Sequence, residues 1–143
     1  MTDTITLRDL GPDDLGVLLS VPEGLFDNDI RADQAQAFLT DTKHLLTLAF
    51  AGDLAIGMVS GTVLLHPDKA PALFVNEVGV RESHQRRGIA TLLTTHILSR
   101  ARALGCEGVW LATETDNEPA LGLYRSLKGQ ELPAVCFGWD DAF

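Results

Sequence analysis

A polar loop suited to binding an anion is the most informative stretch of this sequence. It follows a predicted strand, leads into a long predicted helix, and consists of Gln85, Arg86, Arg87, Gly88, Ile89 and Ala90, with Thr91 next. The first amides of a helix lack partners within the helix and lie at its positive end, which favours phosphate groups. Gly88 lets the backbone approach a ligand closely, and the two arginines add positive charge. The pattern indicates a pyrophosphate site, against the alternative of an ordinary strand–loop–helix junction with surface arginines.

The loop differs from the two commonest nucleotide-binding fingerprints. It lacks the Gly-x-x-x-x-Gly-Lys-Ser/Thr pattern of phosphate-binding ATPases and the three glycines of dinucleotide-binding folds. The charge along the chain is uneven: the net charge is −9, yet residues 81–102 contain five arginines and one acid. Residues 1–41 show the opposite, with nine acids and two arginines. This distribution indicates two ligands of opposite sign, unless the clustering is a chance feature of a solvated surface.

The elements that must position this loop follow from hydrophobic periodicity. The sequence predicts strands over residues 4–8, 45–51, 54–65, 72–80, 109–115 and 132–139. It predicts helices that start near Pro12 and over residues 32–42, 89–104 and 118–127, with Gly105 ending the third. This order is typical of an α/β domain with a mixed sheet. Because no linker divides the 143 residues, we expect a single domain over residues 1–143.

Two motifs resemble the signatures of a known family. Gln85-x-x-Gly88-x-Ala90 after a strand is similar to the Gln/Arg-x-x-Gly-x-Gly/Ala signature of the GNAT (Gcn5-related) N-acetyltransferases. Asn117-x-x-Ala120-x-x-Leu123-Tyr124 resembles the second signature of that family. The resemblance implies a layered α/β fold with about six to seven strands, splayed middle strands and about four helices. It also implies an enzyme that transfers an acetyl group from acetyl-coenzyme A to an amine.

The resemblance further implies roles for individual residues. The amides of residues 86–90, with Thr91, would bind the pyrophosphate of coenzyme A. Val78 and Val80 would hydrogen-bond the pantetheine arm through their backbones, with a β-bulge at Gly79 between them. The strand near residues 111–113 would diverge from this one and leave a cleft for the thioester. Asn117 would reach the pantetheine region or its bound water.

Amine acetylation needs a neutral amine, a polarised carbonyl and a proton for the leaving thiolate. Tyr124 falls where the family has its thiolate-protonating tyrosine, so it is the expected acid; the alternative is an aromatic side chain packed under the last helix. Glu77 interrupts an apolar strand and is the expected base, unless it pairs with Arg81 or is simply exposed. Glu114 is the reserve base, and a water chain to solvent is the third option.

The acidic N-terminal third bears on the identity of the acceptor, because in this fold the first helices usually form the acceptor wall. Asp27, Asp29 and Asp140, with Asp33 and Asp141, could gather around a cation, which favours polyamines or aminoglycosides. More weakly, the chain resembles the short aminoglycoside 3-N-acetyltransferases in residues 11–13, 87–90 and 118–124 and in its acidic final strand. The alternatives are a protein lysine or N-terminal acetyltransferase and a non-catalytic acyl-coenzyme A sensor.

Three further expectations concern a turn, the core and a possible interface. Lys128 stands where the family usually has the glycine of Leu-Gly-Phe, so Gly129 is expected to make the turn one residue later. Cys106 and Cys136 lie in apolar surroundings and are expected in the core. The resemblance also allows a homodimer paired through C-terminal strands, with Trp110, Trp139 and Phe143 at the interface.

Composition argues against several other classes of partner. The negative net charge is unsuited to nucleic acid, and no apolar run approaches the roughly 20 residues that span a bilayer. The cysteines and four histidines lack metal-ligand spacing, so no metal is expected. The start, Met1-Thr2-Asp3-Thr4, lacks the features of a secretory signal, and a cytoplasmic location is expected.

Overall fold

A computed structural model describes residues 4–143; Met1–Asp3, which enter the expectation about a secretory signal, lie outside the described residues. Of the described residues, 4–112 form one compact unit and 113–143 a second. The first unit contains β1 (Ile5–Asp9), α1 (Leu15–Leu19), α2 (Ala32–Thr40), β2 (His44–Ala51), β3 (Leu54–Leu64), β4 (Ala72–Val80), the 3-10 helix η1 (Glu82–His84), α3 (Ile89–Ala103) and β5 (Gly108–Trp110). The second contains α4 (Glu118–Ser126).

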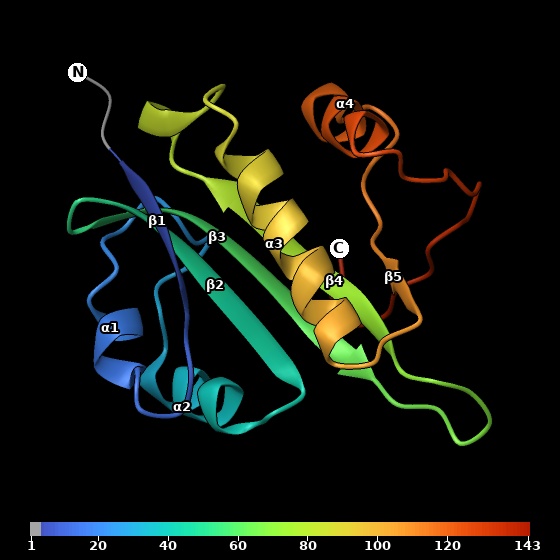
Figure 1. Cartoon of the computed structure of the whole chain (residues 1–143), viewed down its shortest axis with the longest axis horizontal. Coiled ribbons are helices and arrows are strands. Elements are labelled where there is room, and N and C mark those ends of the chain that lie inside the picture. The colour runs from blue at the N-terminus through green and yellow to red at the C-terminus, as the bar shows by residue number, and fades with distance from the viewer. Residues whose placement is uncertain (1–3) are drawn as a thin grey trace. The chain divides into compact units, whose positions relative to one another are not determined.

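The strands form one mixed sheet in the order β1-β2-β3-β4-β5 (Figure 1). The first four are antiparallel to their neighbours, and β5 joins β4 in parallel. The predicted α/β class and its four helices are confirmed for residues 4–143. The strand number is wrong, because the sheet of the described residues has five strands rather than six to seven.

The strand predicted over residues 132–139 is absent from the described structure. The segment has no ladder partner there, and its apolar side chains are exposed, with Phe137 at 78% and Trp139 at 76%. Cys136 lies in this segment and is exposed, so its predicted place in the core is wrong, whereas Cys106 is buried as expected. Alternating apolar residues form a strand only where a neighbouring strand supplies hydrogen bonds and a surface to pack on.

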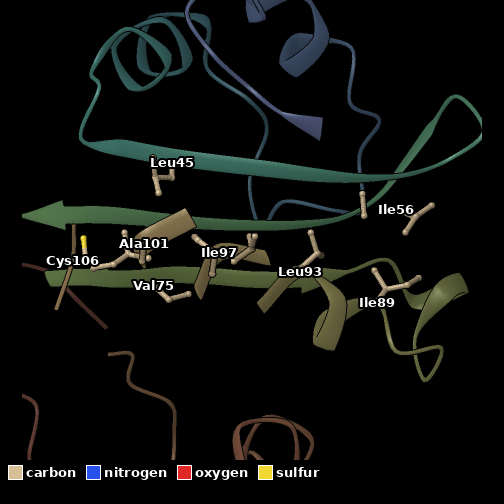
Figure 2. Close-up of a cluster of buried hydrophobic side chains, with 11 residues drawn as sticks. Leu45, Ile56, Val75, Ile89, Leu93, Ile97, Ala101 and Cys106 are labelled. Carbon is tan, nitrogen blue, oxygen red and sulfur yellow. The ribbon is translucent and has the colours of Figure 1, made fainter. Parts of the chain in front are cut away.

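Helices cover both faces of the sheet of the first unit. Leu45 and Ala49 of β2 pack with α3, whereas Leu46 and Leu48 pack in the cluster that contains α1 and α2. This division follows from the period of two in a strand, which sends successive side chains to opposite faces. Figure 2 shows the cluster on the α3 side, where the buried α3 side chains pack between the helix and the strands.

Two glycines of β3 let α3 lie close to the sheet. A Cβ added at Gly57 would lie 2.9 Å from Leu93 Cδ1 and 3.0 Å from Ile89 Cγ2. One added at Gly61 would lie 3.0 Å from Ile97 Cδ1. Gly57 therefore allows the first two turns of α3 to pack closely on the sheet. The polar loop leads into this end of the helix.

The ends of α3 and α4 show how well local signals predict helix termini. Gly105 follows the C-cap residue Leu104 of α3 and takes a left-handed φ of 83°, which confirms the predicted stop. After α4 the left-handed residue is Lys128, with a φ of 67°, rather than Gly129. The Gly129 amide donates to Tyr124 O at 3.0 Å, which closes the helix end. The expected turn at Gly129 is therefore wrong by one residue.

Candidate active site

The polar loop has a backbone that turns its amides outward at the start of α3. After η1 the chain passes through Arg86, with a φ of 64°, and Gly88, with a φ of 78°. Alternation of right-handed and left-handed backbone is how successive amides come to surround an anion. A Cβ on Gly88 would meet nothing within 4 Å, so this position requires glycine for its φ and not for lack of space.

The amides of residues 86–91 have no protein acceptors in the described residues. The first amide of α3 with a backbone partner is that of Leu92, which donates to Gly88 O at 3.0 Å, and no side chain caps the helix. Arg86 and Arg87 are exposed and form no ion pair within residues 4–143. Free amides, the positive end of a 15-residue helix and two unpaired arginines fit a diphosphate.

Other expected cofactor residues surround this loop. The Gln85 side chain donates to Val80 O at 3.2 Å, which ties the loop to the end of β4. Ile89 is buried and anchors the first turn of α3, whereas Thr91 is exposed on that turn and Ala90 is partly exposed. The structure thus gives Gln85 and Ile89 a positioning role and leaves Ala90 and Thr91 facing outward.

One edge of β4 is open beside the loop. β5 pairs with β4 only over Ala72–Phe74, and the strand predicted over residues 109–115 ends at Trp110. The part of β4 that contains Val78, Gly79 and Val80 pairs with β3 on one side and with no described strand on the other. Because β5 ends at Trp110, this edge of β4 has no strand partner among the described residues, and its contact with the pantetheine arm stays a prediction.

The β-bulge of β4 lies at Asn76 and not at the predicted Gly79. Ser60 of β3 pairs with Glu77 and the next residue, Gly61, pairs with Val75, so Asn76 is the extra residue. Val75 lies in the α3 cluster and Val78 packs against it. Because two residues instead of one lie between these two valines, the bulge turns both Asn76 and Glu77 to the opposite face.

On that face, both residues line an open pocket of about 590 Å³. Its charged lining is three acids, Asp27, Asp29 and Glu77, and one base, Arg31. Its apolar lining includes Phe26, Phe38 and Met58, and its neutral polar lining includes Ser60, Thr62 and Asn76. A larger hollow of about 700 Å³ lies along β1 and α1, but it contains none of the expected site residues. Because the expected acids Asp27, Asp29 and Glu77 line the smaller pocket, that pocket is the candidate site.

Glu77 is the acid of this pocket best suited to accept a proton. Partial burial raises the pKa of Glu77 above its usual 4.5, and the negative charge of Asp27 raises it further. Arg81 does not pair with Glu77 in the described residues, so that alternative is excluded, whereas the Glu77 side chain is exposed, as the other alternative states. A carboxylate made more basic in this way takes a proton from an ammonium group more readily. Asp33, which was expected near the acceptor, instead forms an exposed ion pair with Arg31 at 3.0 Å.

Arg81 is a positioning residue that the sequence did not reveal. Its guanidinium donates to Pro22 O and Glu23 O, both at 2.6 Å, and to Ala55 O at 2.7 Å. Gly24 has a φ of 104°, which disfavours a side chain, and a Cβ there would lie 2.9 Å from Arg81 Nη1 and displace the guanidinium. Arg81 thereby fixes the loop that carries Asp27 and Asp29 to the sheet. The signal available in the sequence was a glycine, Gly24, in an acidic loop.

The remaining expected residues lie in the second unit. Asn117 caps α4, and its Oδ1 accepts a hydrogen bond from the Ala120 amide at 3.2 Å. Tyr124 lies two turns further along α4 and is half-buried, and this burial raises the pKa of its hydroxyl above 10.0. Glu114 and Asp140 are exposed, and Asp140 has a left-handed φ of 54°.

Residues 4–143 contain neither a membrane-spanning helix nor a cluster of metal-ligating side chains. None of their helices has both the length and the apolar character that membrane spanning requires. No three His, Cys, Asp or Glu side chains of this part of the chain gather in a group that could hold a metal ion.

Comparison with known sequences agrees with this geometry. A sequence model described as "Acetyltransferase (GNAT) family" matches residues 16–129. A mycothiol acetyltransferase of Nocardia farcinica is 33% identical over 138 residues, which is 87% of this chain. The chain spans 45% of the length of that relative.

Solved structures show the same fold. An aminoglycoside acetyltransferase from an uncultured soil metagenomic sample, in complex with sisomicin, has a TM-score of 0.85 and 20% identity, covering 95% of each chain. An aminoglycoside N-acetyltransferase in complex with coenzyme A has a TM-score of 0.78 and 19% identity, covering 99% of this chain and 98% of that one. At these identities the similarity shows the fold alone.

Proposed function

Because this chain belongs to the GNAT family of acetyltransferases, we propose that it transfers an acetyl group from acetyl-coenzyme A to a primary amine of a small cationic acceptor. The observation that carries the proposal is the pair of complementary sites in the first unit. The outward amides and free arginines of residues 86–91 suit a diphosphate, and the acidic pocket suits an amine. The aminoglycoside- or polyamine-like acceptor follows from this charge.

The loop and β4 would hold the cofactor. The amides of residues 86–91, with Arg86 and Arg87, bind the diphosphate, and the free edge of β4 at Val78 and Val80 hydrogen-bonds the pantetheine amides. Asn117 stays a predicted contact of that region. When bound, acetyl-coenzyme A supplies an acetyl thioester as the group donor. The residues of the loop fix its position and so convert a bimolecular reaction into one between two held partners.

The pocket would prepare the acceptor. An alkylammonium has a pKa of about 10, so it must lose a proton before it can act as a nucleophile. Asp27 and Asp29 attract the cation, and Glu77 takes its proton directly or through one water. The raised pKa of Glu77 lowers the cost of this transfer, because the carboxylate becomes a stronger base.

Tyr124 would hold the proton that a departing thiolate needs. Its pKa is raised by burial, so the phenol is protonated at neutral pH, which is the state that a general acid requires. Tyr124 is the one tyrosine of the sequence. A non-catalytic sensor would need neither this hydroxyl nor the Glu77 carboxylate, which separates the enzyme from that alternative.

One experiment tests the proposed function. Thiol release from acetyl-coenzyme A is followed with a panel of aminoglycosides, polyamines, lysine peptides and free N-terminal peptides. We expect release with small cationic amines, and a loss of at least about 10²-fold in kcat for Glu77→Gln. Binding of coenzyme A without release on any amine would favour the sensor, and release on peptides alone would favour a protein acetyltransferase.

We also propose a homodimer that buries the C-terminal segment. Residues 132–143 expose large apolar side chains, among them Val135 at 78% and Phe143 at 89%. Light scattering after gel filtration should give twice the chain mass, and Phe137→Asp should give the mass of one chain. A single-chain mass for the wild type would overturn the dimer. The cytoplasmic location stays a prediction.

A further inference from the structure

The pocket has a neutral polar side that the proposed function does not use. The bulge turns Asn76 into the pocket beside Glu77, and the Asn76 Nδ2 group donates to Thr62 Oγ1 at 2.9 Å. Ser60 is paired in register with Glu77, is 6% exposed, and its hydroxyl has no hydrogen-bond partner in the described residues. A pocket built only for a polymethylene amine would have no use for these groups.

His44 fixes the orientation of Thr62 and, through it, of Asn76. The Thr62 hydroxyl lies 3.3 Å from His44 Nδ1, and His44 Nε2 lies 3.9 Å from Asp41 Oδ2. The imidazole also packs against Phe38, with 5.0 Å between ring centroids. With the ring proton on Nε2, toward the carboxylate, Nδ1 accepts from Thr62 and the Thr62 oxygen accepts from Asn76.

This chain of hydrogen bonds crosses three neighbouring strands and leaves one group free. Its members belong to β2, β3 and β4, and all three side chains line the pocket. The Asn76 Nδ2 group is engaged, whereas Asn76 Oδ1 has no partner in the described residues. The free oxygen is a hydrogen-bond acceptor of fixed orientation, one residue from Glu77.

We propose that Asn76 determines the specificity for the acceptor, and that the acceptor is a hydroxylated amine of the amino sugar or aminocyclitol class. The inference rests on the proposed function and sharpens it. A hydroxyl near the reacting amine donates to Asn76 Oδ1, and a second hydroxyl meets Ser60. A linear or ring amine without hydroxyls leaves both polar groups unpaired, and a site built for hydroxyls rejects such ligands for this reason.

The test compares two acceptors that differ only in hydroxyls. 2-Deoxystreptamine and cis-1,3-diaminocyclohexane share a six-membered ring and two amines in the same positions. We expect the wild type to acetylate the hydroxylated amine with the higher kcat/KM. Asn76→Leu and Thr62→Val should lower that value about 5- to 10-fold, mainly through KM. Neither variant should lower the value for the hydroxyl-free amine.

Matched variants control for folding and for the cofactor site. Thr62→Ser keeps the hydroxyl and should restore the wild-type preference, and Thr95→Val makes the same exchange at an exposed position of α3 and should change nothing. Coenzyme A affinity, by calorimetry, should be equal in all variants. Equal rates of the wild type on the two amines, or equal losses on both in Asn76→Leu, would overturn this inference alone. No thiol release by the wild type with either amine would overturn the proposed function and this inference with it.

Discussion

Replacing Gly57 with alanine tests whether the packing of α3 on β3 sets the geometry of the pyrophosphate loop. The new Cβ would lie 2.9 Å from Leu93 Cδ1 and 3.0 Å from Ile89 Cγ2, where carbon atoms normally lie about 3.5–4.0 Å apart. Both side chains are buried, at 0% and 3% exposure, and cannot turn aside into solvent. Overpacking of this kind costs about 1–3 kcal/mol. For a chain of this size it should lower Tm by about 2–12 °C.

The same substitution should also weaken cofactor binding, because Ile89 begins α3 and its amide belongs to the proposed anion site. Loss of one hydrogen bond to a charged group costs about 1.5–3 kcal/mol, so the Kd for coenzyme A should rise about ten-fold or more. Gly61→Ala is the matched control: its Cβ would lie 3.0 Å from Ile97 Cδ1, two turns further along the helix. It should lower Tm similarly and leave the Kd unchanged. Calorimetry with coenzyme A and thermal unfolding measure both, and an equal Kd for the two variants would refute the reasoning.

Three further predictions concern protons. The kcat/KM of the wild type should fall as pH drops through the raised pKa of Glu77, and Asp27→Asn should move this fall to lower pH, since it removes the negative charge that opposes ionisation; pH profiles of both proteins test the direction. Tyr124→Phe should lower kcat by about 10²-fold or more and leave coenzyme A affinity unchanged, and an unaltered kcat would eliminate the tyrosine as the acid. Burial raises the pKa of Asp9, but hydrogen bonds from a threonine and a histidine and the charge of an arginine outweigh it and hold the pKa below 3.8. The ionised carboxylate therefore stabilises the fold above that value and stops doing so as pH falls through the lower folded-state pKa, so Asp9→Asn should reduce the loss of Tm on acidification below pH 4.

Elements whose signals are local were predicted well from the sequence. The strands β2 and β3 are long apolar runs joined by a turn at Gly52, and their ends fall within a residue or so of the predicted ones. The third helix follows the spacing of its apolar residues and stops before Gly105. The unpartnered amides at the start of α3 were also foreseeable, because the first amides of a helix have no partners within the helix.

Features that depend on distant partners were not foreseeable in the same way. Residues 132–139 alternate like a strand, but the alternation does not say which strand, if any, lies beside them. The attachment of the acidic loop by Arg81 joins residues almost 60 positions apart, with separations of 58 and 59 to the two loop carbonyls.

The position of the bulge could have been predicted from the spacing of the apolar residues in β4. Leu73 and Val75, then Val78 and Val80, are apolar at a period of two that breaks by one residue in the middle. Such a break in a strand whose valines all belong to one core face predicts an extra residue between Val75 and Val78, whereas the choice of Gly79 rested on the family resemblance. The break also explains the site, since it places a neutral amide and a carboxylate side by side in the pocket. Deleting Asn76 would remove the bulge, and the regular alternation of Val75, Glu77 and Val78 would keep Glu77 on the pocket face, opposite Ser60. We therefore expect both the deletion and Asn76→Ala to retain activity toward hydroxyl-free amines and to lower kcat/KM for hydroxylated ones, and a folded deletion variant that is inactive on both amines would contradict this.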